Sequence, residues 1–189
     1  MPTQIQMNRI IEQKGQALWQ RFCESNDADD YAEYQTQAKT VFGLSPFVAE
    51  HCIRHPDWLR FAADNRLAAS EFAGELRARL NEQSTEDAVQ RELRQFRNRA
   101  MCAIAWQDLT NAQPIEDSLK QVSALANALI YEAYHWHYEA LSQRYGVPAG
   151  PYGAQPMLML AMGKLGGSEL NFSSDIDLIF CYPYKGETE

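Results

Sequence analysis

The sequence predicts a mostly α-helical bundle followed by the first strands of an α/β (α+β) core with a mixed sheet. Apolar residues recur every three to four positions from the amino terminus to about residue 145, which is the period of amphipathic helices. Gly146 and Pro148 end this pattern and open a stretch rich in Gly and Pro that reaches Pro156. Short apolar runs separated by glycines then follow. We therefore predict a helical region over 1–150 and the start of a second domain over 151–189.

The first helices are defined by their apolar sides and by the residues that end them. Residues 5–24 predict one helix, which Asn26 and Asp27 interrupt. A second helix is expected to pass through Tyr31–Phe42 and to end near Gly43, because glycine adopts the positive φ of a C-cap at little cost.

The remaining helices follow from capping residues and prolines. Ser45 and Pro46 are typical of a helix start, and Pro56 ends that short helix and opens another turn. Three further helices are predicted, over Leu67–Leu80, Ser84–Thr110 and Pro114–Arg144.

The last part of the chain carries the pattern with chemical content. The apolar run Met157–Met162 predicts a strand covered on both faces. Gly166, Gly167 and Ser168 follow it, and a turn of such small residues leaves backbone amides that a phosphate can approach. Apolar residues resume in Ser173–Phe180 as a second short strand.

Asp175 and Asp177 lie two residues apart in that second run. Residues at this spacing share one face of a strand, so the two carboxylates are expected to converge beside the glycine turn, about 6 to 7 Å apart. Their repulsion is relieved by a hard divalent cation, and Mg²⁺ prefers one or two carboxylates together with phosphate oxygens. The pattern therefore predicts metal-assisted phosphoryl or nucleotidyl transfer.

Each half of this pattern is common by itself, because Asp-x-Asp often marks a strand end and Gly-Gly-Ser is often an ordinary turn. Their order along the chain is more restrictive and favours a catalytic site. Two other interpretations stay open. An Asp-x-Asp glycosyltransferase would also bind a metal and a nucleotide sugar, and a helical protein-interaction module would have no catalytic site at all.

The run AMGKLGGSELNFSSDIDLIF, residues 161–180, resembles the signature of the glutamine synthetase adenylyltransferase family, which belongs to the DNA polymerase beta-like nucleotidyltransferase superfamily. Residues 45–59 and 91–106 resemble the amino-terminal part of that family more loosely. The resemblance implies a chain with two nucleotidyltransferase domains, of which this sequence resembles the first. It implies that the first domain removes AMP from a tyrosine of glutamine synthetase by phosphorolysis, giving ADP, and that the second adds AMP from ATP. It also implies regulation by glutamine and the PII signal protein.

Residue by residue, the resemblance assigns Asp175 and Asp177 to the metal pair, and it assigns the phosphate-cradling turn and nucleotide contacts to Gly166, Gly167, Ser168 and Ser174. Asn171 and Ser173 match the motif without an assigned role. The superfamily places a third carboxylate on a later strand, and Glu187 and Glu189 follow the second strand too closely to replace it. We therefore expect an amino-terminal piece of a longer enzyme, with an incomplete site and little activity alone.

Composition argues against some classes of binding partner and indicates a cellular compartment. The net charge is -8 and the isoelectric point is near 5.0, so the long-range field opposes binding to nucleic acid or to an anionic membrane. No signal sequence or membrane-spanning run is evident. The four cysteines are widely spaced without a Cys-x-x-Cys pair, which favours reduced thiols and a cytoplasmic protein.

Several other polar residues are better explained by packing or by solvent exposure than by a site. They are the histidine pairs His51 with His55 and His135 with His137, and the arginines Arg91, Arg94 and Arg97. For the arginines a contact with an anion or a partner stays open. Lys164, within the glycine turn, is equally consistent with a phosphate contact and with an exposed turn position.

Overall fold

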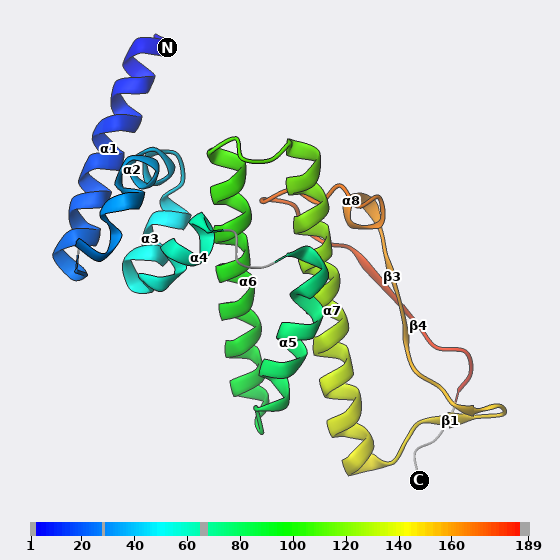
Figure 1. The fold of residues 1–189 in the computed structure, drawn as a ribbon. Helices are drawn as coiled ribbons and strands as arrows, with labels where there is room; N and C mark the ends of the chain where they lie inside the picture. The colour runs from blue at the N-terminus through cyan, green and yellow to red at the C-terminus, as the bar shows by residue number, and fades with distance from the viewer. Residues whose placement is uncertain (1–2, 28, 65–67, 186–189) are drawn as a thin grey trace. The chain divides into compact units, whose positions relative to one another are not determined.

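The computed structural model describes residues 3–27, 29–64 and 68–185 (Figure 1). The chain divides into two compact units. Unit 1 consists of Met1–Ala68 with Phe96–Ser118, and unit 2 of Ala69–Gln95 with Leu119–Glu189. The predicted helical bundle followed by the start of an α/β core is confirmed.

Unit 1 is helical throughout its described part. Its elements are α1 (Gln4–Ser25), the 3₁₀ helix η1 (Asp29–Tyr34), α2 (Gln35–Leu44), α3 (Pro46–Arg54), α4 (Asp57–Ala63) and the carboxyl-terminal part of α6 (Glu86–Leu109). Predicted caps are present, because the Ser45 hydroxyl accepts a hydrogen bond from the Val48 amide at 3.3 Å and Pro46 occupies the first turn of α3. The single helix predicted through Tyr31 is instead divided between η1 and α2.

Aromatic side chains form the centre of the unit 1 core. Phe22 is completely buried, and its ring lies 5.1 Å from Trp19 in a stacked arrangement and 5.1 Å from Tyr31 in an edge-to-face one. Phe42 completes the group at 6.2 Å from Phe22. Such pairs add stabilisation beyond the apolar area that they bury. Aromatic residues from α1, η1 and α2 therefore meet in one core.

Gly43 does not cap α2 as predicted. It lies inside the helix, which ends at Leu44, and it is buried. A Cβ at this position would collide with the carbonyl oxygen of Ile11 in α1, and a Cβ at Gly15 would collide with the carbonyl oxygen of Lys39 in α2. Both glycines therefore let the backbones of α1 and α2 approach closely, which is a role that periodicity does not reveal.

Unit 2 combines helices with short strands. Its elements are η2 (Ala69–Glu71), α5 (Phe72–Asn81), the first part of α6, most of α7 (Ile115–Tyr145), β1 (Ala149–Gly150), β2 (Gly153–Ala154), β3 (Leu158–Ala161), α8 (Gly163–Gly166) and β4 (Leu178–Cys181). The helices over Ser84–Thr110 and Pro114–Arg144 are confirmed. Leu67, with which the predicted preceding helix begins, lies outside the described residues, as do Glu187 and Glu189.

Charged pairs connect the helices of unit 2. Arg77 of α5 forms two hydrogen bonds to the carboxylate of Glu132 in α7, at 2.9 and 2.8 Å, and Glu132 is only 2% exposed. Arg79 of α5 contacts both Glu75 and Glu92, the latter in α6 at 2.9 Å. A buried carboxylate requires such a partner because desolvation without one is costly. The Arg77–Glu132 pair thus joins α5 to α7, and the Arg79–Glu92 pair joins α5 to α6.

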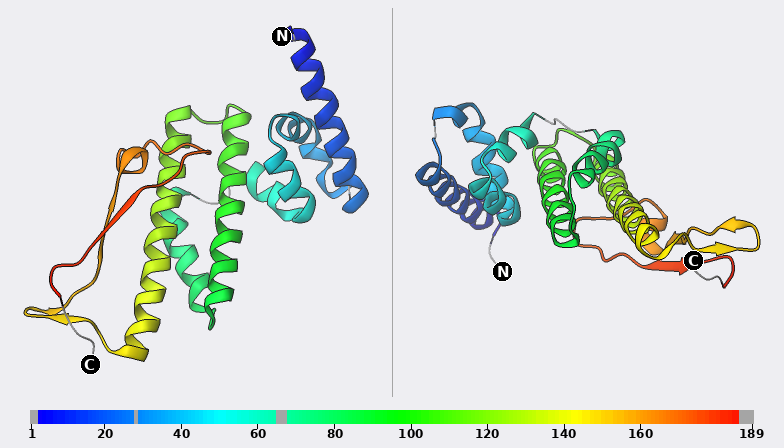
Figure 2. Two further views of the ribbon diagram at one scale, coloured as in Figure 1. Left: turned by 180° about the vertical axis from the view of Figure 1, so that it is seen from behind. Right: turned by 90° about the horizontal axis from the view of Figure 1, so that it is seen from below.

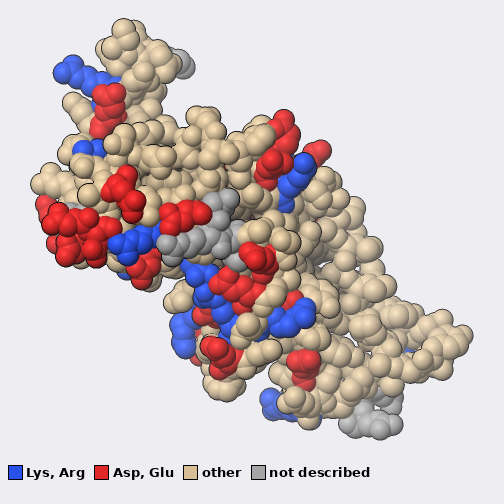
Figure 3. Space-filling view, in the orientation of Figure 1, with Lys and Arg blue, Asp and Glu red and all other residues tan. Residues whose placement is uncertain are grey.

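The strands form two antiparallel pairs, β1 with β2 and β3 with β4. The stretch from Gly146 to Pro156, predicted as a loop, thus contains a small hairpin. In the β3–β4 pair Leu160 lies opposite Ile179, and both are about half exposed, at 52% and 46%. The prediction that the first strand is covered on both faces is wrong for the described residues. Figure 3 shows few charged side chains over the β3–β4 hairpin, and Leu158 and Phe180 are exposed there as well.

No helix in the described parts of the chain is long and apolar enough to span a membrane. All four cysteines are free thiols, with Cys52 and Cys102 buried in unit 1. Burial raises the pKa of Cys102 to about 12 and raises that of Cys52 well above its usual value.

Candidate functional site

Asp175 and Asp177 lie immediately before β4 rather than within it. The strand begins at Leu178, and both aspartates are exposed. The Asp177 carbonyl oxygen still accepts a hydrogen bond from the Met162 amide at 2.9 Å, which extends the ladder between β3 and β4 by one step. This corrects the predicted start of the second strand, since aspartate is disfavoured in strands and no regular pairing continues before Asp177 in the described segment. That the two carboxylates share one face stays a prediction.

The glycine turn is a single turn of helix, α8, rather than an open loop. The amides of Gly166, Gly167 and Ser168 donate to the carbonyl oxygens of Met162, Gly163 and Leu165, at 3.1 to 3.2 Å. Leu165 is 3% exposed and fixes the turn in unit 2. These three amides already donate hydrogen bonds within the turn, so a phosphate would have to accept from the same N–H groups. Their role as a phosphate cradle stays a prediction.

Gly163 brings the turn next to the second aspartate. Its φ of +57° is a conformation that favours glycine, and a Cβ built there would lie 3.9 Å from an oxygen of the Asp177 carboxylate. The carboxylate is thus beside the start of α8, at the junction of strand, turn and strand. The sequence predicted that the aspartates lie beside the glycine turn, but it singled out neither Gly163 nor the helical form of the turn.

A hydrogen-bonded loop connects α8 to the aspartates. The Asn171 side-chain oxygen accepts hydrogen bonds from the Ser173 amide at 3.2 Å and from the Ser174 hydroxyl at 2.7 Å. The Lys164 ammonium of α8 donates to the same Ser174 hydroxyl oxygen at 3.2 Å. Asn171 and Ser173, which matched the motif without a role, and Ser174 therefore shape the loop that carries Asp175.

Two side chains of α7 bind the backbone of this hairpin, and sequence reasoning identified neither. Ser123 accepts a hydrogen bond from the Leu170 amide at 3.0 Å, and Tyr134 accepts one from the Met157 amide at 2.9 Å. A serine inside an apolar helical stripe was the only available signal for the first contact. Figures 1 and 2 show α8 and the β3–β4 pair alongside α7 in each view.

The donor set at Asp175 and Asp177 suits a hard cation in part. Both side chains are exposed, the Asp177 carboxylate lies beside Gly163, and carboxylate oxygens are ligands of the kind that Mg²⁺ prefers. Within the described residues, no group of three or more His, Cys, Asp or Glu side chains is arranged to hold a metal ion. The pair is thus a partial ligand set.

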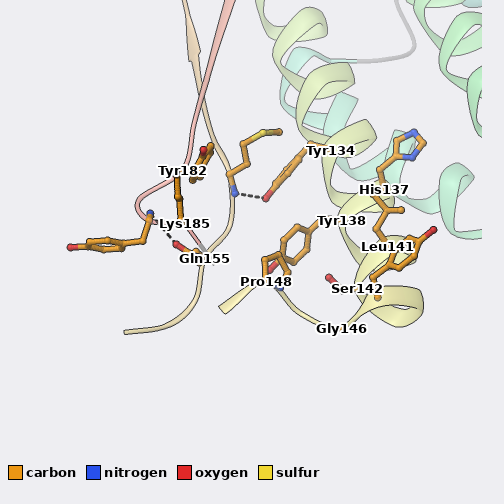
Figure 4. A pocket seen from close by; sticks show the side chains of 13 residues that line it. Tyr134, His137, Tyr138, Leu141, Ser142, Gly146, Pro148, Gln155, Tyr182 and Lys185 are labelled. Atoms are coloured by element: carbon orange, nitrogen blue, oxygen red, sulfur yellow. Dashed lines mark hydrogen bonds between the residues drawn. The ribbon is translucent and has the colours of Figure 1, made fainter. Parts of the chain in front are cut away.

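A cavity of about 800 Å³ in unit 2 lies at the opposite end of the β3–β4 pair (Figure 4). Met157 and Tyr182, which flank the Leu158 and Cys181 ends of the strands, line it, whereas Asp177 follows the ladder at the Ala161 end. Four residues of strand separate the two ends, about 13 Å. Three tyrosines of α7 and two that follow β4 are among the lining residues, and neither aspartate lines the cavity.

The remaining predicted clusters take structural or surface positions. The rings of His51 and His55 stack on Trp58, at 5.5 and 4.5 Å. Burial, with the nearby positive charge of Arg54, lowers the pKa of His51. The predicted solvated arginines Arg91, Arg94 and Arg97 are all exposed, and His135 of the other pair contacts Glu139 at 3.1 Å.

Comparison with known proteins adds an independent line of support. Residues 35–189 match the family model described as glutamate-ammonia ligase adenylyltransferase. The chain is similar to proteins named bifunctional glutamine synthetase adenylyltransferase/adenylyl-removing enzyme. These include one from Shewanella loihica (44% identical over 97% of this chain and 20% of the relative), one from Shewanella frigidimarina (45% over 83% and 17%) and one from Shewanella oneidensis (42% over 96% and 20%).

The chain spans about a fifth of the length of these relatives. The matched region includes the strand, turn and strand that carry Gly163 and Asp177, and most of the helices before them. The family match favours an adenylyltransferase over the alternative of a glycosyltransferase. With the match covering most of its length, the chain belongs to the glutamate-ammonia ligase adenylyltransferase family.

Proposed function

We propose that this chain contributes the metal-binding part of an adenylyl-removing site, which acts on a tyrosine of glutamine synthetase by phosphorolysis. The observation that carries the proposal is the position of the Asp177 carboxylate beside Gly163, where strand, turn and strand meet. An exposed carboxylate at such a junction, with a second exposed aspartate two residues before it, can share a cation with a phosphate ligand. The names of the relatives include glutamine synthetase and adenylyl removal, which supports this substrate protein and this class of reaction.

The proposed reaction transfers the adenylyl group from tyrosine to inorganic phosphate. An oxygen of phosphate bonds to the phosphorus of the AMP group, the bond from phosphorus to the tyrosine oxygen breaks, and ADP leaves while the tyrosine oxygen takes a proton. Asp175 and Asp177 would hold Mg²⁺, which supplies charge neutralisation at the phosphorus and at the leaving oxygen.

Other side chains of the turn would orient the nucleotide. Ser168 has an exposed side chain, so its hydroxyl is available to a phosphate oxygen. Lys164 and Ser174 are held together by their hydrogen bond, which places a positive charge next to the loop. In the intact enzyme the proposed partners are glutamine synthetase as substrate, ATP and ADP as nucleotides, and PII as regulator.

A binding experiment tests the metal site in this chain directly. We expect calorimetry to detect ADP binding that depends on Mg²⁺ and that is lost in Asp175→Asn and in Asp177→Asn, because each variant removes one charged ligand. Asp87→Asn, at an exposed position in the first turn of α6, is the matched control and should bind as the unmodified chain does. Equal Mg²⁺-dependent binding by all variants would exclude these aspartates as the metal ligands. Absence of Mg²⁺-dependent ADP binding from every variant and from the unmodified chain would favour a helical interaction module.

Activity provides a second test. The chain alone should release little or no ADP from adenylylated glutamine synthetase and phosphate, because no third acidic, histidine or cysteine ligand joins the aspartate pair among the described residues. A protein as long as the relatives should turn over. Comparable turnover by the short chain would contradict the proposal that its site is incomplete.

A further inference from the structure

Helix α7 binds the hairpin that carries the aspartates at two points. Tyr134 bonds the Met157 amide before β3, and Ser123 bonds the Leu170 amide after α8. Eleven residues separate Ser123 from Tyr134, which is about 16 Å along the helix axis. The segment between the two contacts contains β3 and α8, so α7 determines where the turn and the following loop lie.

The Ser123 contact is the better defined of the two. Ser123 is 2% exposed, and its hydroxyl donates its single proton to the Leu119 carbonyl oxygen at 2.9 Å. Because that proton is used within the helix, the oxygen is left as an acceptor, and it accepts from the Leu170 amide at 3.0 Å. Both groups are buried, so removing the hydroxyl would leave the amide without this acceptor away from water.

Leu170 links this contact to the loop. It is 4% exposed, and among the described residues after 145 only Leu165 is also buried. Leu165 lies within α8 and Leu170 follows Leu165 by five residues, so buried side chains hold both ends of the stretch between them. Asn171 comes next and bonds Ser174, which lies directly before Asp175. The loop thus passes from a buried anchor through one side-chain hydrogen bond to the exposed aspartates.

We propose that Ser123 is a positioning residue for Asp175 and Asp177. Its hydroxyl fixes the Leu170 amide, and through Asn171 and Ser174 it limits the range of positions open to the two carboxylates. Metal ligands held by such outer contacts lose affinity when those contacts are removed. The inference rests on the proposed metal site, but the contact itself can be measured without metal.

The test uses the ¹⁵N-labelled chain with Mn²⁺, a paramagnetic cation that also favours oxygen ligands. In the unmodified chain, Mn²⁺ should broaden the amide signals of residues 171–177 first. In Ser123→Ala, the Leu170 amide should exchange with solvent about ten-fold faster, and the Mn²⁺ concentration that gives half broadening should rise about ten-fold. Tyr134→Phe should have a smaller effect on Mn²⁺, because its contact is at the far end of β3.

Two controls separate positioning from a general loss of stability. Val89→Ala removes buried methyl groups from α6 in the same unit and should lower the melting temperature without changing the Mn²⁺ response. Thr40→Ala removes only a bond from the hydroxyl to a carbonyl four residues earlier and should change neither measurement.

The outcomes decide the two proposals separately. Unchanged Leu170 exchange in Ser123→Ala, or a Mn²⁺ loss of equal size in Val89→Ala, would overturn the positioning role. Failure of Mn²⁺ to broaden residues 171–177 in the unmodified chain would overturn the metal site, and the exchange rate, measured without metal, would still show whether Ser123 holds the loop.

Discussion

The aromatic core of unit 1 and the β3–β4 hairpin of unit 2 are both built from apolar sequence, yet they differ in what covers them. Phe22 is completely buried among aromatic rings, whereas Phe180 of β4 is 57% exposed. Helices α1 and α2 cover each other, while the described residues leave Leu160 and Ile179 open to solvent. The comparison shows that apolar composition favours burial but does not supply the surface that buries it. An exposed apolar patch of this kind is typical of an interaction surface.

Truncation of one phenylalanine in each region gives the largest expected difference. Phe22→Ala removes a buried ring and should lower the free energy of unfolding by about 3 to 5 kcal/mol. Phe180→Ala removes a ring that is more than half exposed and should cost less than about 1 kcal/mol. Denaturant titrations followed by circular dichroism measure both. Similar losses for the two variants would mean that the hairpin face is covered in solution.

Breaking one ion pair in each unit should have an intermediate effect on stability. Arg77→Ala leaves the buried Glu132 carboxylate without this partner and should lower the melting temperature clearly. Arg21→Ala breaks a pair with Glu50 in which both side chains are more than a third exposed, and it should change the melting temperature little. A larger loss in Arg21→Ala than in Arg77→Ala would contradict the view that burial of the carboxylate decides the effect.

Thiol labelling compares the β3–β4 hairpin with the core of unit 1 without any mutation, so it perturbs the fold least. Cys181 of β4 is partly exposed and should react first with a chromogenic disulfide reagent at pH 8. Cys52 and Cys102 are buried and have raised pKa values, so the reactive thiolate is scarce and they should react only on unfolding. The rates are read from absorbance, with the denatured chain as the reference for four reactive thiols. Rapid labelling of Cys102 in the native chain would show that the core opens.

Much of the helical part could be predicted because its signals are local. The period of apolar residues and the capping role of Ser45 with Pro46 depend on neighbours within a few positions, and the structure confirms them. The predicted C-cap at Gly43 is wrong because a non-local contact decides its role. Its local signal is that of a helix end, whereas its position is determined by the backbone of Ile11, a helix away.

For the candidate site, the order of glycines and aspartates in the sequence predicted that the aspartates lie beside the glycine turn, and the structure places the Asp177 carboxylate next to Gly163. Tertiary structure alone decided the rest. In the structure the glycines form a helical turn whose amides are hydrogen-bonded, and Ser123 and Tyr134 bind the backbone of the hairpin. These contacts join residues that are far apart in the sequence. A local pattern of residues does not specify which distant segment will pack against it.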